Sequence, residues 1–239
     1  MFCYLLICSI ILTLPLSAQR NGKLQDTTTT TYFYEPYPQD VGSYILQLGG
    51  SFTLLPTSVV EDEYPTPAVD LQYKRGIFTN VSAVGSFSTN YFTNLLHIGI
   101  QWNLKLDRFS FGFANHVGGF GGHISVEGQF DDNAAYAFYY LPIVRFGYRF
   151  DEFSLSMSWA ISYIFKSVSK VSDLRTRGPD KTINDIFCTI AVEQPFLKST
   201  HISIGLSLAY SRTPYQSWLL YNTIDEYLFV PEFFFGFQL

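Results

Sequence analysis

The feature that most constrains the fold is a strict period-two alternation of large apolar and small side chains. The odd positions of residues 153–165 are all large and apolar, and the even positions 154–162 are Ser or Ala. A helix would mix the two classes on each face, whereas a β-strand separates them completely. The same alternation returns in residues 96–106, 202–210 and 227–239. The sequence therefore predicts an all-β protein.

Weaker alternations complete a set of ten predicted strands, an even number. The predicted strands lie near residues 43–55, 66–76, 77–89, 93–106, 108–118, 136–150, 152–166, 183–194, 199–211 and 227–239. Short links are expected at 74–76, 106–108, 150–152 and 193–200, and long polar links at 56–65, 119–135, 167–182 and 212–226, with a short link at 88–91 as the exception. Short periplasmic turns that alternate with longer external loops are typical of a transmembrane barrel with both termini in the periplasm, and we expect this arrangement here.

The composition indicates which face of these strands meets lipid. Hydrophobic residues make up 47% of the chain and charged residues 15%, against about a quarter in soluble domains. A secreted soluble barrel would turn its apolar face inward and expose charged residues. Here the second face is mainly Ser, Gly, Ala, Asn and Gln, which suits a polar lumen. Strands in lipid must form a closed sheet, so we expect an antiparallel up-and-down transmembrane β-barrel. The net charge of -5 argues against a nucleic-acid partner.

The N-terminal region divides into two parts ahead of the barrel. Residues 1–18 are apolar and end in Leu16-Ser17-Ala18, which predicts a cleaved signal peptide. Cleavage would remove Cys3 and Cys8, leaving Cys188 and therefore no internal disulfide. Residues 19–41 are polar and predict a flexible or extended N-terminal arm. The barrel itself is expected over residues 42–239.

Taken together, these features resemble those of Gram-negative outer-membrane β-barrel proteins. The resemblance rests on the signal ending Leu16-Ser17-Ala18, the period-two strands, and the final strand Phe233-Phe234-Phe235-Gly236-Phe237-Gln238-Leu239. That last stretch looks like the insertion signal read by the barrel-assembly machinery. The resemblance implies residence in the cell outer membrane, with lipid, that machinery and other envelope proteins as partners. The expected role is non-enzymatic: a structural or accessory subunit of an envelope complex, or a very narrow passive pore.

Several charged residues are predicted to point into the lumen. They are Asp70, Lys74, Lys105, Arg145, Arg149, Asp185, Glu193 and Glu232. Buried charges need partners, so we expect an ion-pair and hydrogen-bond network that plugs the barrel. The alternative is a narrow water path beside the small side chains that point inward within residues 110–114, 154–162 and 203–209.

One sequence element suggests a different class of function. His123, Ser125 and Glu127 would share one face of an extended segment and supply a base, a nucleophile and an orienting carboxylate. They weakly resemble the His-x-Ser element of outer-membrane lipid A deacylases, which makes a lipid hydrolase the alternative function. The simpler interpretation is the polar face of an external loop, as for the Gly118–Gly122 stretch. Neither the acidic clusters nor His116 has metal-ligand spacing, so no metal or cofactor is expected.

Overall fold

The computed structural model describes residues 32–57, 65–126, 130–171, 174–177, 180–197, 200–213 and 226–239. The strands are β1 (Tyr44–Leu54), β2 (Pro65–Phe78), β3 (Val81–Thr89), β4 (Thr93–Leu106), β5 (Phe109–Val126), β6 (Phe130–Arg149), β7 (Ser154–Val171), β8 (Leu174–Arg177), β9 (Thr182–Leu197), β10 (Thr200–Ser211) and β11 (Leu228–Gln238). Within these ranges, no helix is long and apolar enough to cross a membrane.

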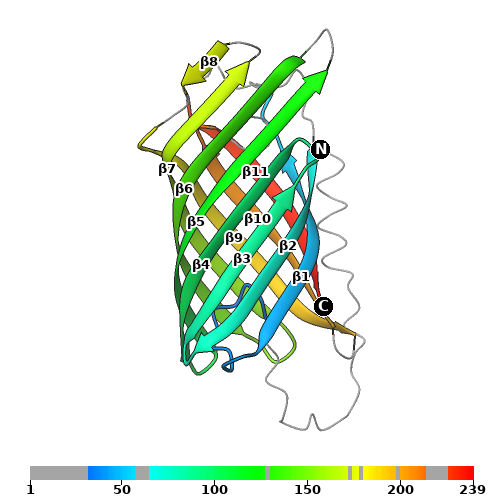
Figure 1. Cartoon of the computed structure of the whole chain (residues 1–239). Helices are drawn as coiled ribbons and strands as arrows, with labels where there is room; N and C mark the ends of the chain where they lie inside the picture. The colour runs from blue at the N-terminus through cyan, green and yellow to red at the C-terminus, as the bar shows by residue number, and fades with distance from the viewer. Residues whose placement is uncertain are drawn as a thin grey trace. The chain divides into compact units, whose positions relative to one another are not determined.

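Ten of these strands form one closed antiparallel barrel (Figure 1). Each strand from β1 to β6 pairs with the next in the chain, β6 pairs with β7, and β7, β9, β10 and β11 follow in order. Pairing of β1 with β11 closes the ring. β8 lies outside the ring, because it pairs with the far part of β7 in a short hairpin. The predicted ten-strand up-and-down barrel is confirmed.

Tight turns connect the strands at one end of the barrel, which we call the turn end. Two of them contain a residue with positive φ, Asn80 at 67° and Asp107 at 57°, a backbone geometry that Asn and Asp tolerate better than most residues. The turn predicted at residues 74–76 is wrong. Lys74 and Gly76 still pair with Val84 and Ser82 of β3. The chain reverses around residues 79–80, five residues after the start of the predicted turn.

The opposite end, the loop end, contains strand extensions where the sequence predicted loops. β5 and β6 continue past the ring as a long hairpin, so most of the predicted link 119–135 is strand. The Gly118–Gly122 stretch is therefore part of β5, and its interpretation as a flexible loop is wrong. A Cβ atom at Gly118 would lie 2.5 Å from the carbonyl oxygen of Leu96 on β4, so this glycine permits close strand packing. The predicted short link near 88–91 is present as residues 90–92.

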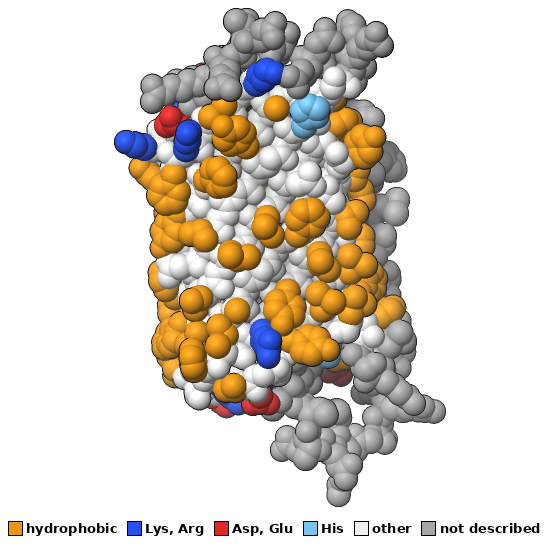
Figure 2. Space-filling model, in the orientation of Figure 1, with side chains coloured by type: hydrophobic (Ala, Val, Ile, Leu, Met, Phe, Trp, Pro, Cys, Tyr) orange, Lys and Arg blue, Asp and Glu red, His pale blue; other side chains and the backbone are white. Residues whose placement is uncertain are grey.

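The outer surface of the barrel is apolar (Figure 2). Ile100 and Trp159 expose 58% and 44% of their surfaces, although large apolar side chains are normally buried in soluble proteins. Exposed Tyr and Trp residues include Tyr44, Tyr73, Trp102, Tyr210 and Tyr227. An outward apolar band bordered by aromatic side chains is the surface that a bilayer solvates.

The expected orientation, with the turn end in the periplasm and the loop end outside the cell, leads to a labelling prediction. In a Cys188→Ser background, Tyr91→Cys should react with an impermeant maleimide added to intact cells, because Tyr91 is 91% exposed at the loop end. Asp107→Cys at the turn end should stay unlabelled until the outer membrane is opened. Labelling of Asp107→Cys in intact cells, with Tyr91→Cys protected, would mean that the barrel is inserted the other way round.

Candidate functional site

A segment of the chain just before β1 lies inside the barrel. Residues 32–39, the internal segment, occupy the lumen near the turn end and bury Tyr32, Phe33, Glu35 and Pro36 almost completely, whereas residues 40–42 are exposed. The segment bends at its centre, where the amide of Tyr37 donates to the carbonyl oxygen of Glu35 over 2.8 Å. The predicted arm of residues 19–41 thus has most of its described part, residues 32–39, inside the lumen. Residues 1–31, including the predicted signal peptide, lie outside the described residues.

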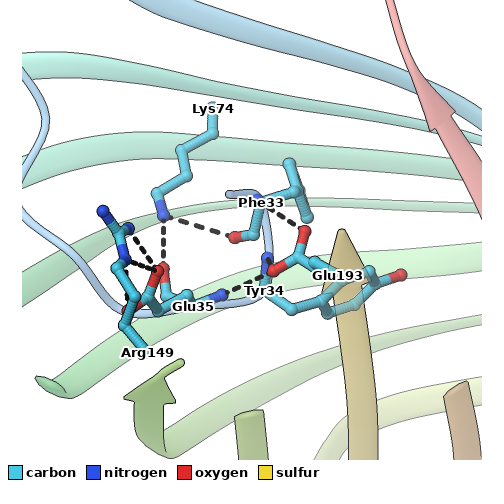
Figure 3. A network of polar contacts seen from close by, with 6 residues as sticks. All are labelled: Phe33, Tyr34, Glu35, Lys74, Arg149 and Glu193. Carbon is cyan, nitrogen blue, oxygen red and sulfur yellow. Dashed lines mark hydrogen bonds and ion pairs between the residues drawn. The ribbon is translucent and has the colours of Figure 1, made fainter. Parts of the chain in front are cut away.

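Glu193 of β9 holds the bend of the internal segment (Figure 3). Its carboxylate accepts hydrogen bonds from three consecutive backbone amides, those of Phe33 at 2.7 Å, Tyr34 at 2.8 Å and Glu35 at 3.0 Å. The hydroxyl oxygen of Ser203 also lies 3.4 Å from this carboxylate. A carboxylate that is 1% exposed would be costly without such donors, so the segment satisfies the charge of Glu193.

Lys74 of β2 contacts the same bend through carbonyl oxygens. Its buried ammonium group donates to the carbonyl of Phe33 over 3.2 Å and to that of Glu35 over 3.1 Å. The internal segment therefore presents amides to an acid on one wall and carbonyls to a base on another (Figure 3). This arrangement satisfies two fully buried charges with backbone groups rather than with each other.

Arg149 of β6 binds the side chain of Glu35. Its Nε lies 3.1 Å from Oε2 and 3.3 Å from Oε1 of Glu35, and the two side chains form an ion pair. The Arg149 guanidinium also lies 4.1 Å from the centre of the Tyr37 ring, with the ammonium of Lys105 4.7 Å from the same ring. Burial, partly opposed by Arg149, raises the pKa of Tyr32 to about 12, so this phenol stays neutral at physiological pH.

Two glycines in the barrel wall leave room for the internal segment. A Cβ atom at Gly112 would lie 2.6 Å from Cβ of Pro36. One at Gly147 would lie 2.9 Å from Cγ of Glu35, too close for any real contact. The two glycines lie on the paired strands β5 and β6, near each other but not directly opposite. Gly112 pairs with Arg145, and Gly147 pairs with Ser110. The wall is thus shaped to fit the segment.

Polar side chains fill the rest of the lumen at this level. Gln101 and Asn103 are fully buried and joined by a 2.5 Å hydrogen bond, and the Asn103 amide reaches Ser82 over 3.4 Å. On the other side, Ser203 donates to Gln47 over 2.9 Å. None of these five side chains exposes more than 2% of its surface, so water has little access to the lumen wall at this level.

A cavity of about 250 Å³ lies in the lumen beyond the internal segment. Phe33 and Tyr34 of the segment form part of its lining, together with side chains from the strands around the ring. Among the predicted lumen charges, Asp70, Arg145, Asp185 and Glu232 line this cavity. Its lining also includes apolar side chains, which the alternation analysis did not place in the lumen.

The inward direction predicted for the charged residues agrees with the structure. Four of the eight line the cavity, Lys74, Glu193 and Arg149 bind the internal segment, and Lys105 stacks on Tyr37 near the turn end. The partners, however, differ from the predicted cross-barrel network, because the internal segment supplies most of them. The inward glycines and the buried Glu193 and Lys74 were the sequence signals for an inserted segment.

The structure separates the predicted hydrolase residues from the cavity. His123 and Ser125 lie on the face of β5 opposite to that of the cavity-lining Phe120, and both are exposed on the outer face. Glu127 lies outside the described residues. A different histidine pair faces inward: His97 and His116 both line the cavity, with ring centres 5.4 Å apart. In the described part of the chain, no cluster of three His, Cys, Asp or Glu residues could hold a metal ion.

No family model and no curated protein matches the chain. Solved structures with a similar strand arrangement include the translocator domain of the autotransporter NalP from Neisseria meningitidis, with 9% identity and a TM-score of 0.40 over 84% of this chain and 88% of that one. The outer-membrane protease OmpT from Escherichia coli follows with 10% identity and a TM-score of 0.39 over 88% and 98% of the two chains. The KdgM porin has 10% identity and a TM-score of 0.36 over 80% and 97%.

The class of the protein follows from its closed ring of ten strands and its apolar outer band. The chain is a closed, ten-stranded transmembrane β-barrel. Within this class, the barrel has its lumen occupied at the turn end by its own internal segment and retains a separate cavity toward the loop end.

Proposed function

We propose that this chain is a closed, non-conducting barrel of the outer membrane that serves as a structural or accessory subunit of an envelope complex. The observation that carries the proposal is the internal segment, which occupies the lumen and bonds to Lys74, Arg149 and Glu193 on three different strands. A barrel of ten strands is also little wider than the eight-stranded case that side chains fill, whereas open channels belong to about sixteen strands.

The narrow passive pore is the other function considered for this chain. It would need a continuous water path past the internal segment, beside Gln101, Asn103 and Ser82. The burial of those three side chains favours closure instead. In a closed barrel, the outer surface, the loop end and the cavity are the parts left to carry a function, which is consistent with an accessory role.

Conductance and copurification test this proposal together. The purified full chain should give no steady single-channel steps in a planar bilayer. From mild-detergent extracts of native membranes it should copurify with another envelope protein in a fixed ratio. Steady unitary currents from the intact chain would instead establish the pore, and purification as an isolated barrel under those mild conditions would remove the accessory role.

A further inference from the structure

The cavity beyond the internal segment has an uneven lining. The positions nearest the segment include Arg145, His97, His116 and Gln72, contributed by β6, β4, β5 and β2. Toward the loop end, the lining also contains large apolar side chains from β4, β5, β6, β7, β9 and β11. These are Leu95, Phe120, Leu141, Ile143, Ile164, Phe187 and Val230. The cavity therefore combines a polar inner end with apolar walls.

Arg145 is the most demanding group at the inner end. Its Nε and Nη1 atoms are buried, and no described residue provides a hydrogen-bond acceptor for either of them. A buried guanidinium with unpaired N–H groups is costly, because its five N–H donors are fixed in a planar fork that needs anionic or carbonyl oxygens. The carboxylate of Glu193 interacts with Arg145 electrostatically, but it already accepts three amides of the internal segment.

Neighbouring polar atoms at the inner end also lack partners. Within the described residues, these are Nδ1 of His97, both ring nitrogens of His116, and Oε1 of Gln72. The imidazoles can donate a hydrogen bond from one nitrogen each, so they can supplement the fork of Arg145. Buried polar groups that find no partner within a protein, gathered in one cavity, indicate a site for a ligand or for ordered water.

The carboxylates in the lining leave this polar cluster available to an anion. Glu232 accepts a hydrogen bond from Thr53 over 2.8 Å, and Asp185 accepts one from Ser211. Asp70 also lines the cavity, on β2 opposite Ser88. Neither Nε nor Nη1 of Arg145 is hydrogen-bonded to any of these three acids.

We propose that the cavity binds a small organic anion with a compact apolar body, of the class of aryl or medium-chain monocarboxylates. The carboxylate accepts N–H donors of Arg145 in a charge-assisted contact, and His97 and His116 donate to it. The apolar body lies against Leu141, Ile143 and the facing side chains. A volume of about 250 Å³ holds roughly eight waters or one small aromatic acid. The internal segment closes the inner end, so the ligand enters from the loop end; this step rests on the proposed closed barrel.

Calorimetric titration of the full-length protein in an uncharged maltoside detergent tests the site. Phenylacetate is the probe, and phenylacetamide is its neutral analogue of nearly the same shape. We expect saturable binding of phenylacetate with a dissociation constant of about 1 mM or tighter, and at least tenfold weaker binding of the amide. Arg145→Gln should abolish the preference for the acid. The matched control Lys105→Gln, which removes a lumen-side cation outside the cavity lining, should keep it.

A second variant locates the bound molecule independently of Arg145. Ala160 lines the cavity beside the apolar cluster, so Ala160→Phe should fill the space and weaken both probes at least tenfold. Equal affinity for acid and amide, no saturable binding of phenylacetate, or a preference that survives Arg145→Gln would each overturn the proposal. None of these outcomes measures current, so binding and closure of the barrel can fail separately.

Discussion

Replacing Glu193 with Gln is expected to release the internal segment from the lumen while leaving the barrel folded. The carboxylate accepts three backbone amides, and a Gln side chain has one acceptor oxygen and presents an NH₂ group to donors. Removing one partner from a buried charge network costs about 3 to 5 kcal/mol. Lys74 would lose its two carbonyl acceptors once the segment leaves, which adds to the effect.

Thiol accessibility measures this release directly. In a Cys188→Ser background, Pro36→Cys places a thiol at a fully buried position of the segment without removing a side-chain hydrogen bond. A loss of 3 to 5 kcal/mol in docking corresponds to a roughly 10²- to 10³-fold or greater rise in labelling rate, if reaction requires the undocked segment. Glu232→Gln is the matched control, an inward carboxylate on β11 bonded to Thr53, and should leave the rate unchanged. Equal rates in all three proteins would show that Glu193 does not hold the segment.

Trp159→Arg is expected to reduce the folded barrel strongly. Trp159 lies at the centre of Ser154–Ile164, the part of β7 that pairs with both β6 and β9, and exposes its side chain on the apolar outer face. An Arg at the midplane of the lipid face costs about 2 to 4 kcal/mol. It would also remove the contact with the Phe146 ring, whose centre lies 5.6 Å away. Heat-modifiable mobility on gels after refolding into vesicles gives the folded fraction.

Ser207→Arg provides the comparison on the opposite face. Ser207 lines the cavity and lies opposite Glu232 in the β10–β11 ladder, so the new cation would have an acid beside it. It should retain a larger folded fraction than Trp159→Arg, despite losing the 3.0 Å hydrogen bond between Ser207 and Thr189. The reverse order of stability would contradict the assignment of inner and outer faces.

The barrel could be predicted because its strands carry a repeated chemical contrast. In β7, every second residue from Ser154 to Ser162 is small and the residues between are large, so the sequence allows only one assignment of the inner and outer faces of this strand. β6 lacks that contrast: Ala137, Tyr139 and Leu141 point inward while Phe138 points outward, and both faces are apolar. Period-two analysis cannot find an apolar cavity wall in such a strand, because the signal depends on the two faces differing.

The internal segment was missed for a different reason. Its bonds to the barrel join residues 39 to 160 positions apart, and most use backbone amides and carbonyls, which every sequence contains. The side-chain signals were limited to Glu35, Glu193 and Lys74 and to two glycines beside the segment. Gly147 lies next to Glu35 and Gly112 next to Pro36. The inward direction of the charged side chains was predicted correctly. Nothing in the sequence, however, indicated that a backbone segment would be among their hydrogen-bond partners.

The wide separation in sequence between the internal segment and its partners affects the order of folding. Residues 33–35 are near the start of the chain, while Glu193 belongs to β9, and Arg149 to the end of β6. The segment can make all its bonds only after those strands stand in place around a common lumen, which β1 and β11 enclose by pairing with each other. Contacts of such long range form slowly. Docking of the first described residues is therefore a late folding event, and protection of these residues would report that an individual barrel has finished closing.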